Sequence, residues 1–188
     1  VPTVLVAGGM ALPLAYLVIR TLGVGTEAWD LLWRSRTLDI LIRSLLLVVA
    51  VAGASVLIAV PLAWLTVRTD LPWRRVWSVA TVLPLVIPSY VGGFIVVVAL
   101  GPRGMLQGWL APLGVERLPD IYGFPGAMLT LTLLSYPYVL LPVHAALGRL
   151  DPALEEVSRS LEHTSWTTFR RITLPLLRPA VAAGTVLV

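Results

Sequence analysis

Two adjacent acids, Glu155 and Glu156, lie in a short charged segment between long apolar stretches. Apolar residues recur around them at three- and four-residue steps, the spacing of one face of a helix. These apolar residues are Leu150, Leu154, Val157 and Leu161. Two carboxylates beside an apolar stripe do not by themselves make a catalytic or metal-binding site, but they suit the docking of a partner protein.

Local signals predict the bounds of this helix. Asp151 is suited to the N-cap and Pro152 to the first helical position, so we expect a helix from 152 to about 161. Glu155 and Arg159 are four residues apart in the favourable order for a helical ion pair. Glu155, Arg159 and Glu162 are therefore predicted on the polar face, opposite the apolar stripe.

A second helical piece is predicted after an elbow near Glu162 and His163. Thr164 or Ser165 can cap it, and its apolar edge would be Trp166, Phe169 and Ile172. Leu174-Pro175 is expected to end it, because the residue before a proline avoids the helical region. Two functions suit such a loop: a helix lying in the lipid headgroup layer, or a helix that docks a partner. The acidic pair counts against the first, because anionic lipid repels it.

The flanking stretches must cross a membrane. The chain has 188 residues, of which 57% are hydrophobic and only 13% charged, whereas a soluble domain carries about a quarter charged residues. A helix needs roughly 20 mostly apolar residues to span the hydrocarbon core. The stretches that meet this are 1–19, 44–67, 77–100 and 123–147, and a fifth begins at 179. The fold class predicted is all-α, a polytopic transmembrane helical bundle, forming one permease-like domain over 1–188.

The charge and the ends of the chain add two expectations. The fifth stretch has only ten residues before Val188, so the sequence is expected to be incomplete at its C-terminal end. It starts at Val1 without a Met or a basic leader, so it is expected to be incomplete at its N-terminal end as well. Cytoplasmic loops of membrane proteins collect arginine. The bias towards 68–75 and 149–178 therefore places these two loops inside the cell.

The predicted spans offer little chemistry of their own. The chain has no cysteine, and its four complete spans contain no Asp or Glu. That argues against an ion-gradient-driven secondary transporter, which usually needs an intramembrane carboxylate, and against a membrane-embedded enzyme. A structural or interaction protein remains a third rival. We expect no catalytic residue, no cofactor and no metal site.

A few polar side chains fall within or beside the spans. Tyr90, Tyr136 and Tyr138 could line a path for a hard cation, since oxygen donors suit such ions, or could simply pack between helices. His144 is expected to form an interhelical hydrogen bond rather than to bind a ligand. Arg43 is expected to extend its charge to the membrane surface.

The run from Leu154 to Pro179 resembles the cytoplasmic loop of ATP-binding-cassette importer permeases, the type I, binding-protein-dependent kind. The pattern is Glu-Ala-Ala, three residues, Gly, nine residues, then Ile-x-Leu-Pro. Glu156, Ile172, Leu174 and Pro175 match it at the right spacing. Val157 and Ser158 replace the alanines and Glu162 replaces the glycine. A glycine there would allow positive φ without strain, whereas a glutamate would cost roughly 1 kcal/mol in that conformation. Either the elbow has a different backbone in this chain, or the site is mildly strained.

This resemblance implies a multi-pass protein of the bacterial plasma (inner) membrane that pairs with a second permease unit, a cytosolic ATPase dimer and a periplasmic or lipid-anchored binding protein. ATP hydrolysis would belong to the separate ATPase subunits. The resemblance implies an ATPase-coupling role for Leu154, Glu155, Glu156, Val157, Arg159, Leu161, Glu162, Phe169, Ile172, Leu174 and Pro175.

Within that superfamily, the chain is most similar to the ferric iron permeases. The segments that carry this similarity are 84–92, 118–124 and 136–139. Permeases of the same class for thiamine, polyamines, molybdate or sulfate share the plan and remain alternatives. Iron permeases resemble two fused permease units, so the chain would correspond mostly to one of them.

Overall fold

The computed structural model describes residues 2–23, 33–102, 104–114 and 121–188, and all regular elements in these ranges are helical. The chain divides into two units, Val1–Leu46 and Leu47–Val188. The first unit contains helix α1 (Pro2–Gly23) and the beginning of helix α3 (Ser35–Arg68). The helical fold predicted from the sequence is confirmed.

Helix α3 is the longest element, with 34 residues. At 1.5 Å per residue it measures about 50 Å, more than the thickness of a hydrocarbon core. It contains Pro61 without ending there, since a membrane helix can satisfy the freed carbonyl elsewhere. Near its start, Nε of Arg43 donates to Oδ2 of Asp39 at 2.9 Å, an exposed pair one helical turn apart. Arg43 therefore has a partner on its own helix.

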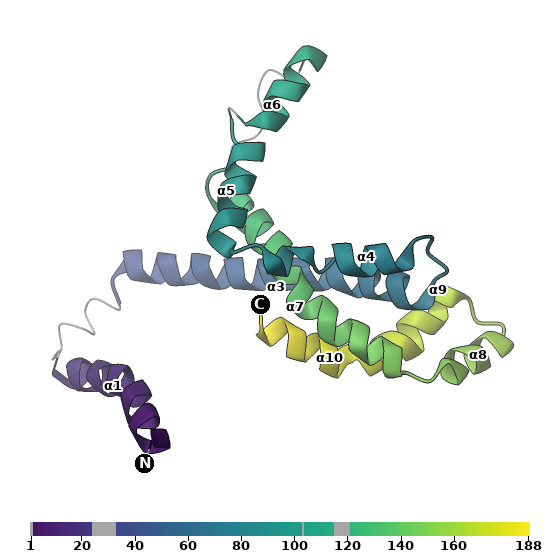
Figure 1. Ribbon diagram of the computed structural model, residues 1–188, viewed down its shortest axis with the longest axis horizontal. Coiled ribbons are helices and arrows are strands. Elements are labelled where there is room, and N and C mark those ends of the chain that lie inside the picture. Colours follow the sequence, from purple (N-terminus) through teal and green to yellow (C-terminus); the bar gives the residue numbers. More distant parts are fainter. Residues whose placement is uncertain (1, 24–32, 103, 115–120) are drawn as a thin grey trace. The chain divides into compact units, whose positions relative to one another are not determined.

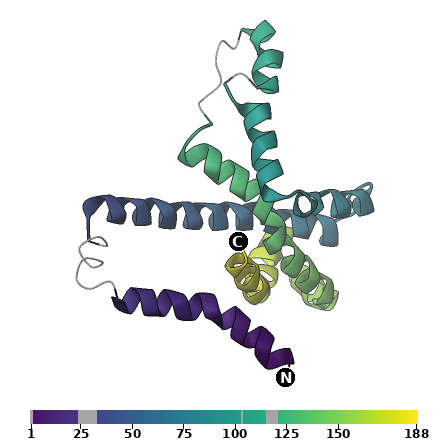
Figure 2. The ribbon, with the colours of Figure 1, turned by 60° about the vertical axis from the view of Figure 1, so that its left-hand side comes forward.

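The third expected span is not one helix. The stretch forms α4 (Arg74–Ala80), a 3-10 turn (Leu83–Val86) and α5 (Ser89–Leu100). Ile87 has an extended ψ of 119° because it precedes Pro88. In Figures 1 and 2, α5 leaves in a direction different from that of α4. The span expected over about 77–100 is therefore divided between α4 and α5, with the break at the 3-10 turn between them.

The chain continues through α6 (Met105–Leu110) and a 3-10 turn (Ala111–Leu113) to α7 (Phe124–Arg149). Helix α7 is 26 residues long and continues through Pro137 and Pro142. The last helix is α10 (Leu174–Val186), which packs along α7.

The core of the second unit lies where α3, α7 and α10 meet. Its buried members are Ala59, Val60, Ala63, Tyr136, Val139, Leu140, Val143, Leu147 and Leu177. Close approach of α10 to α7 depends on Gly184, because a Cβ at this position would lie 2.7 Å from the Cα atom of Val139. Gly92, on α5, is likewise buried, against the side chain of Leu134.

Among the described residues, three stretches are long and apolar enough to cross a membrane: Ser35–Arg68, Ser89–Leu113 and Phe124–Arg149. Their outer faces carry large apolar side chains that the chain itself leaves uncovered. On α3, Leu45, Val49 and Leu57 are all exposed. Such a surface suits lipid or another membrane helix and would aggregate in water.

Candidate functional site

The candidate site is the segment between α7 and α10, which begins with the short helix α8 (Pro152–Ser160). The backbone N–H of Ala153 donates to Oδ1 of Asp151 at 3.0 Å, so Asp151 caps the helix as predicted. Glu155 lies in the first turn, where the helix dipole favours a negative charge. Local residues therefore fix where this helix begins.

The elbow after α8 keeps the backbone expected of a glycine. Glu162 has φ of +61°, in the left-handed region. The N–H of His163 reaches the carbonyl of Ser158 at 3.3 Å, the long closing bond of a Schellman C-cap. That motif places a left-handed residue at the position of Glu162, where glycine is usual. Of the two alternatives, the strained one is observed: the backbone is that of the glycine, and the glutamate adopts it at a steric cost of about 1 kcal/mol.

Replacing Glu162 by glycine is expected to stabilise α8 locally, because glycine adopts positive φ without strain. A gain of about 1 kcal/mol corresponds to about fivefold slower amide exchange in 152–161. Hydrogen–deuterium exchange measures this. The matched control is Glu156→Gly, the same change inside α8, which is expected to speed exchange because glycine disfavours helix interiors. Equal effects of the two changes would contradict the strain at Glu162.

A buried hydroxyl pair holds the two sides of the elbow together. Oγ of Ser158 lies 2.9 Å from Oγ1 of Thr168, and both side chains are buried. Oγ of Ser158 also lies 3.3 Å from Nδ1 of His163. The sequence pattern treated Ser158 only as a replacement for alanine and missed this contact. Small hydroxyl residues on both sides of the elbow were the signal available.

The second half of the segment runs without interruption into α10. Thr164 caps α9 (Ser165–Thr168), with its Oγ1 accepting from the N–H of Thr167. A π-helical turn (Phe169–Thr173) then leads directly into α10. The expectation that Leu174-Pro175 ends this helix was wrong. Proline lacks an N–H and crowds the carbonyl four residues earlier, and the wider π turn relieves that conflict.

Phe169 anchors this second half to α3. Its ring meets that of Trp64 edge to face, with centroids 5.7 Å apart, and stacks on that of Trp166 at the same separation. Ile172, Leu174 and Pro175 are partly buried. The structure therefore places these four predicted coupling residues against their own chain.

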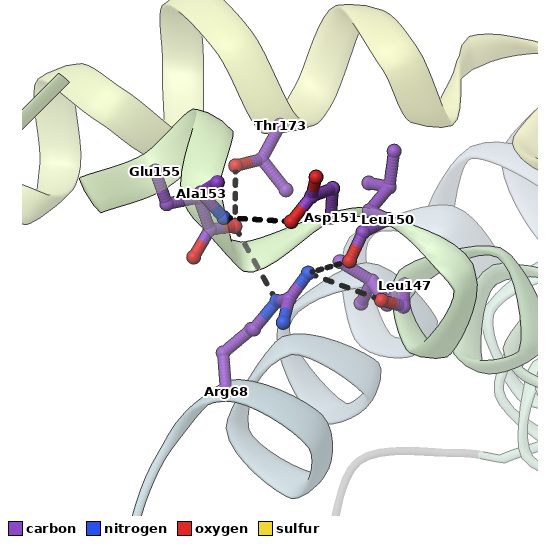
Figure 3. A network of polar contacts seen from close by, with 7 residues as sticks. All are labelled: Arg68, Leu147, Leu150, Asp151, Ala153, Glu155 and Thr173. Carbon is purple, nitrogen blue, oxygen red and sulfur yellow. Dashed lines mark hydrogen bonds and ion pairs between the residues drawn. The ribbon is translucent and has the colours of Figure 1, made fainter. Parts of the chain in front are cut away.

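Glu155 also points into its own chain, as Figure 3 shows. Its Oε1 accepts from the hydroxyl of Thr173 at 3.0 Å and lies 3.4 Å from Nε of Arg68. At this distance Arg68 and Glu155 form an ion pair, although Nε of Arg68 makes no hydrogen bond. The side chains of Arg68 and Glu155 are each only 13% exposed. Glu155 thus lies opposite the apolar stripe, as predicted, but its long-range partner Arg68 turns this polar face towards the protein.

The remaining residues of α8 show the opposite face. Glu156 is exposed, as are Leu154, Val157 and Leu161, the last two at 60% and 66%. Glu162 is also exposed. The side chain of Arg159 lies outside the described part of the structure. The predicted set thus divides into an outward group, with Leu154, Glu156, Val157, Leu161 and Glu162, and an inward group around Glu155.

The three tyrosines of the predicted path lie in different settings. Tyr136 is buried, and its hydroxyl donates to the carbonyl of Thr81 at 2.7 Å, just before the break between α4 and α5. Tyr138 is exposed and lies two positions along α7, on another face of the helix. Tyr90, in the first turn of α5, is also exposed. The contact of Tyr136 is that of a packing residue.

Within residues 2–23, 33–102, 104–114 and 121–188, no group of three His, Asp or Glu side chains is placed to hold a metal ion. The arrangement instead presents an apolar stripe and an acid on a rigidly capped helix.

Comparison with known families assigns this architecture. The family model described as "Binding-protein-dependent transport system inner membrane component" matches residues 56–188, which include α8 and α9. A crystal structure of a bacterial ABC transporter involved in the import of the acidic polysaccharide alginate has the same fold. The TM-score is 0.68 at 21% sequence identity, covering 94% of this chain and 69% of that chain.

The curated relatives are named as permeases for three different substrates. The molybdenum transport system permease protein ModB of Escherichia coli (strain K12) is 36% identical over 111 residues, which is 56% of this chain and 45% of that protein. The Fe(3+)-transport system permease protein FbpB 2 of Haemophilus influenzae is 33% identical over 186 residues, which is 98% of this chain and 33% of that protein. A probable sulfate transport system permease protein, cysT of Chlorella vulgaris, is 32% identical over 60% of this chain and 41% of its own length. The chain spans less than half of each of these relatives.

Proposed function

Because the chain belongs to the family of binding-protein-dependent transport system inner membrane components, we propose that it is the permease subunit of an ATP-driven importer. The family consists of inner-membrane transport components, and the chain is not itself an enzyme. In the importer, the chain would form part of the translocation path, and a cytosolic ATPase would dock on α8.

One observation supports docking at α8 above the others. The helix contacts its own protein through a polar face, with Glu155 and Ser158 three positions apart, and leaves its apolar face outside. A surface helix normally buries its apolar stripe and exposes its polar one. The inverted arrangement leaves the stripe for a partner from outside the chain.

The two candidate occupants of this stripe differ in charge preference. The lipid headgroup layer would cover an apolar face, but anionic lipid would repel the exposed carboxylate of Glu156. A groove on a protein can meet Glu156 with a basic side chain or with backbone N–H groups while it covers Val157 and Leu161. The acid at the edge of the stripe therefore favours the ATPase.

In this mechanism, the ATPase subunits supply the energy and α8 transmits it. Closure of the ATPase dimer on ATP would displace α8, and the attached helices α3, α7 and α10 would follow. A binding protein would deliver substrate to the outer side, and a second permease unit, fused or separate, would complete the path.

We propose ferric iron as the substrate. The iron permease from Haemophilus influenzae aligns over 98% of this chain, including α1 and the start of α3. The molybdenum and sulfate relatives align over 56% and 60%. Of these relatives, only the iron permease therefore aligns with nearly the whole chain. The molybdenum relative has the higher identity over its shorter alignment, so an oxyanion is the rival substrate.

Uptake into proteoliposomes tests this function. The full-length permease, its ATPase and its binding protein would be reconstituted with ATP inside, and labelled ferric iron, molybdate and sulfate would be offered separately. ATP-dependent accumulation of iron alone is the expected result. Accumulation of molybdate or sulfate alone would overturn the substrate but not the importer, while uptake driven by an ion gradient without ATP would overturn both.

A further inference from the structure

Long-range polar contacts from two other segments converge on one residue of the described chain, Arg68, the last residue of α3. We propose that Arg68 positions α8, so that movement of this helix is transmitted to the membrane helices. This role rests on the proposed docking of the ATPase at α8. Arg68 touches neither ATP nor substrate, so it acts through the helix that it holds.

The first step is the tie between α3 and α7. One terminal nitrogen of Arg68 donates to the carbonyl of Leu147 at 3.2 Å and to that of Leu150 at 2.9 Å. These carbonyls lie at the C-terminus of α7, where the last turn of a helix lacks amide donors and attracts a cation. Arg68 therefore completes the end of α7 as a capping residue would (Figure 3).

The second step links α8 to this junction. Glu155 meets Nε of Arg68 and also accepts the hydroxyl of Thr173, which is buried just before α10. The carboxylate thus joins α8 to α3 and to the root of α10 at once. Displacing α8 alone would separate the largely covered carboxylate of Glu155 from the guanidinium of Arg68. Each charge would then lack its partner, which is strongly unfavourable.

The third step concerns orientation. Among the α8 side chains that the structure describes, Ser158 is buried and Glu155 is mostly covered, while the rest are exposed. A helix of nine residues has little stability of its own, so these two polar contacts determine which face it presents. Turning Glu155 inward leaves Glu156 and Val157 outward. Two adjacent acids therefore have different roles: Glu155 attaches the helix and Glu156 is available to the partner.

The test uses the complete transporter with its ATPase and binding protein. Arg68→Met removes every contact, and Arg68→Lys retains a charge but cannot form the forked contact with Glu155 and both carbonyls. In Arg68→Met, ATP hydrolysis is expected to persist while substrate transported per ATP falls about tenfold, with a smaller loss in Arg68→Lys. Arg43→Met is the matched control, because Arg43 is another arginine of α3 that pairs with an acid, but its pair with Asp39 is exposed and stays within α3. Arg43→Met is expected to leave the ratio unchanged.

A double variant separates positioning from stability. Arg68→Met combined with Glu155→Leu leaves no unpaired buried charge, and such replacements commonly restore stability. Assembly is therefore expected to recover in the double variant while the transport ratio stays low. This variant also carries the test if Arg68→Met alone fails to assemble. Recovery of the wild-type ratio in the double variant would overturn the positioning role.

A spectroscopic readout reports on the helix directly. The chain has no cysteine, so spin labels at Val157→Cys on α8 and Leu176→Cys on α10 give one distance. Both positions are exposed. The distance distribution is expected to broaden in Arg68→Met and in the double variant, and to stay narrow in Arg43→Met. An unchanged distribution with an unchanged transport ratio would overturn the role of Arg68 but leave docking intact, whereas failure of the wild-type chain to bind the ATPase would overturn the proposed function itself.

Discussion

Replacing Glu156 by lysine is expected to abolish ATP-coupled transport while the chain still inserts into the membrane. Glu156 is exposed on α8 beside Val157, and the apolar stripe next to it is uncovered. A lysine there would set a positive charge against the basic or N–H groups that we expect on the ATPase. Loss of a desolvated charge contact costs about 2–5 kcal/mol, and at about 3 kcal/mol binding falls more than a hundredfold.

Controls separate this loss from general damage. Glu156→Gln removes the charge but keeps an acceptor oxygen, so its loss is expected to be smaller. Asp39→Lys reverses an exposed acid on α3, far along the chain from α8, and is expected to leave ATP-driven uptake unchanged. Substrate-stimulated ATP hydrolysis and uptake would be measured in parallel. Normal values of both in Glu156→Lys would reject the role of this residue.

Replacing Gly184 by valine is expected to separate α10 from α7. A Cβ at Gly184 would lie 2.7 Å from the Cα atom of Val139 and 3.0 Å from the carbonyl oxygen of Tyr138. Both are backbone atoms and cannot move aside as a side chain would. Overpacking of this kind costs about 1–3 kcal/mol or more, so thermal unfolding of the purified transporter is expected to shift clearly to lower temperature.

Gly53 supplies the matched control for this change. It also lies inside a long apolar helix, α3, but nothing within 4 Å meets a Cβ there. Gly53→Val is therefore expected to leave the unfolding temperature nearly unchanged. An equal loss in both variants would show that the cost comes from the residue type and not from the contact between α7 and α10.

Features of α8 that depend on neighbours in sequence could be predicted. Asp151, Pro152 and Thr164 act within a few residues, so the starts of α8 and α9 follow from local rules. The place of Glu162 in the loop pattern offered a left-handed elbow as one of two alternatives, and the structure has that backbone. The long helices could also be predicted from the sequence, because a long apolar stretch in a membrane has few alternatives to a helix.

The direction of Glu155 could not be predicted, because its partner Arg68 is 87 residues earlier in the chain. Periodicity alone places Glu155 opposite the leucines but does not say which face turns towards the protein. The apolar stripe then suggests the wrong answer for a helix whose attachment is polar. An arginine at the end of a span was the available signal, and it was counted only as a loop charge.

Prolines were the other source of error, because their effect depends on context. Pro84 and Pro88 accompany a true break between α4 and α5, whereas Pro61, Pro137 and Pro142 lie inside continuous helices. Each proline removes one amide donor from a helix. The spacing of prolines alone does not decide whether the helix breaks, because Pro175 and Pro179 are also four residues apart and α10 continues through Pro179. The carbonyl of Thr81 finds its donor in Tyr136, a residue of another helix.

Photocrosslinking from α8 tests the docking most directly. Because the chain has no cysteine, a photoreactive group can be attached singly at Val157→Cys or Leu161→Cys in the assembled transporter, with Leu57→Cys on the exposed face of α3 as the comparison. Crosslinks from both α8 positions to the ATPase polypeptide, absent from Leu57, are the predicted result. Crosslinks from Val157 and Leu161 that reach phospholipid and never another polypeptide would contradict docking at this helix.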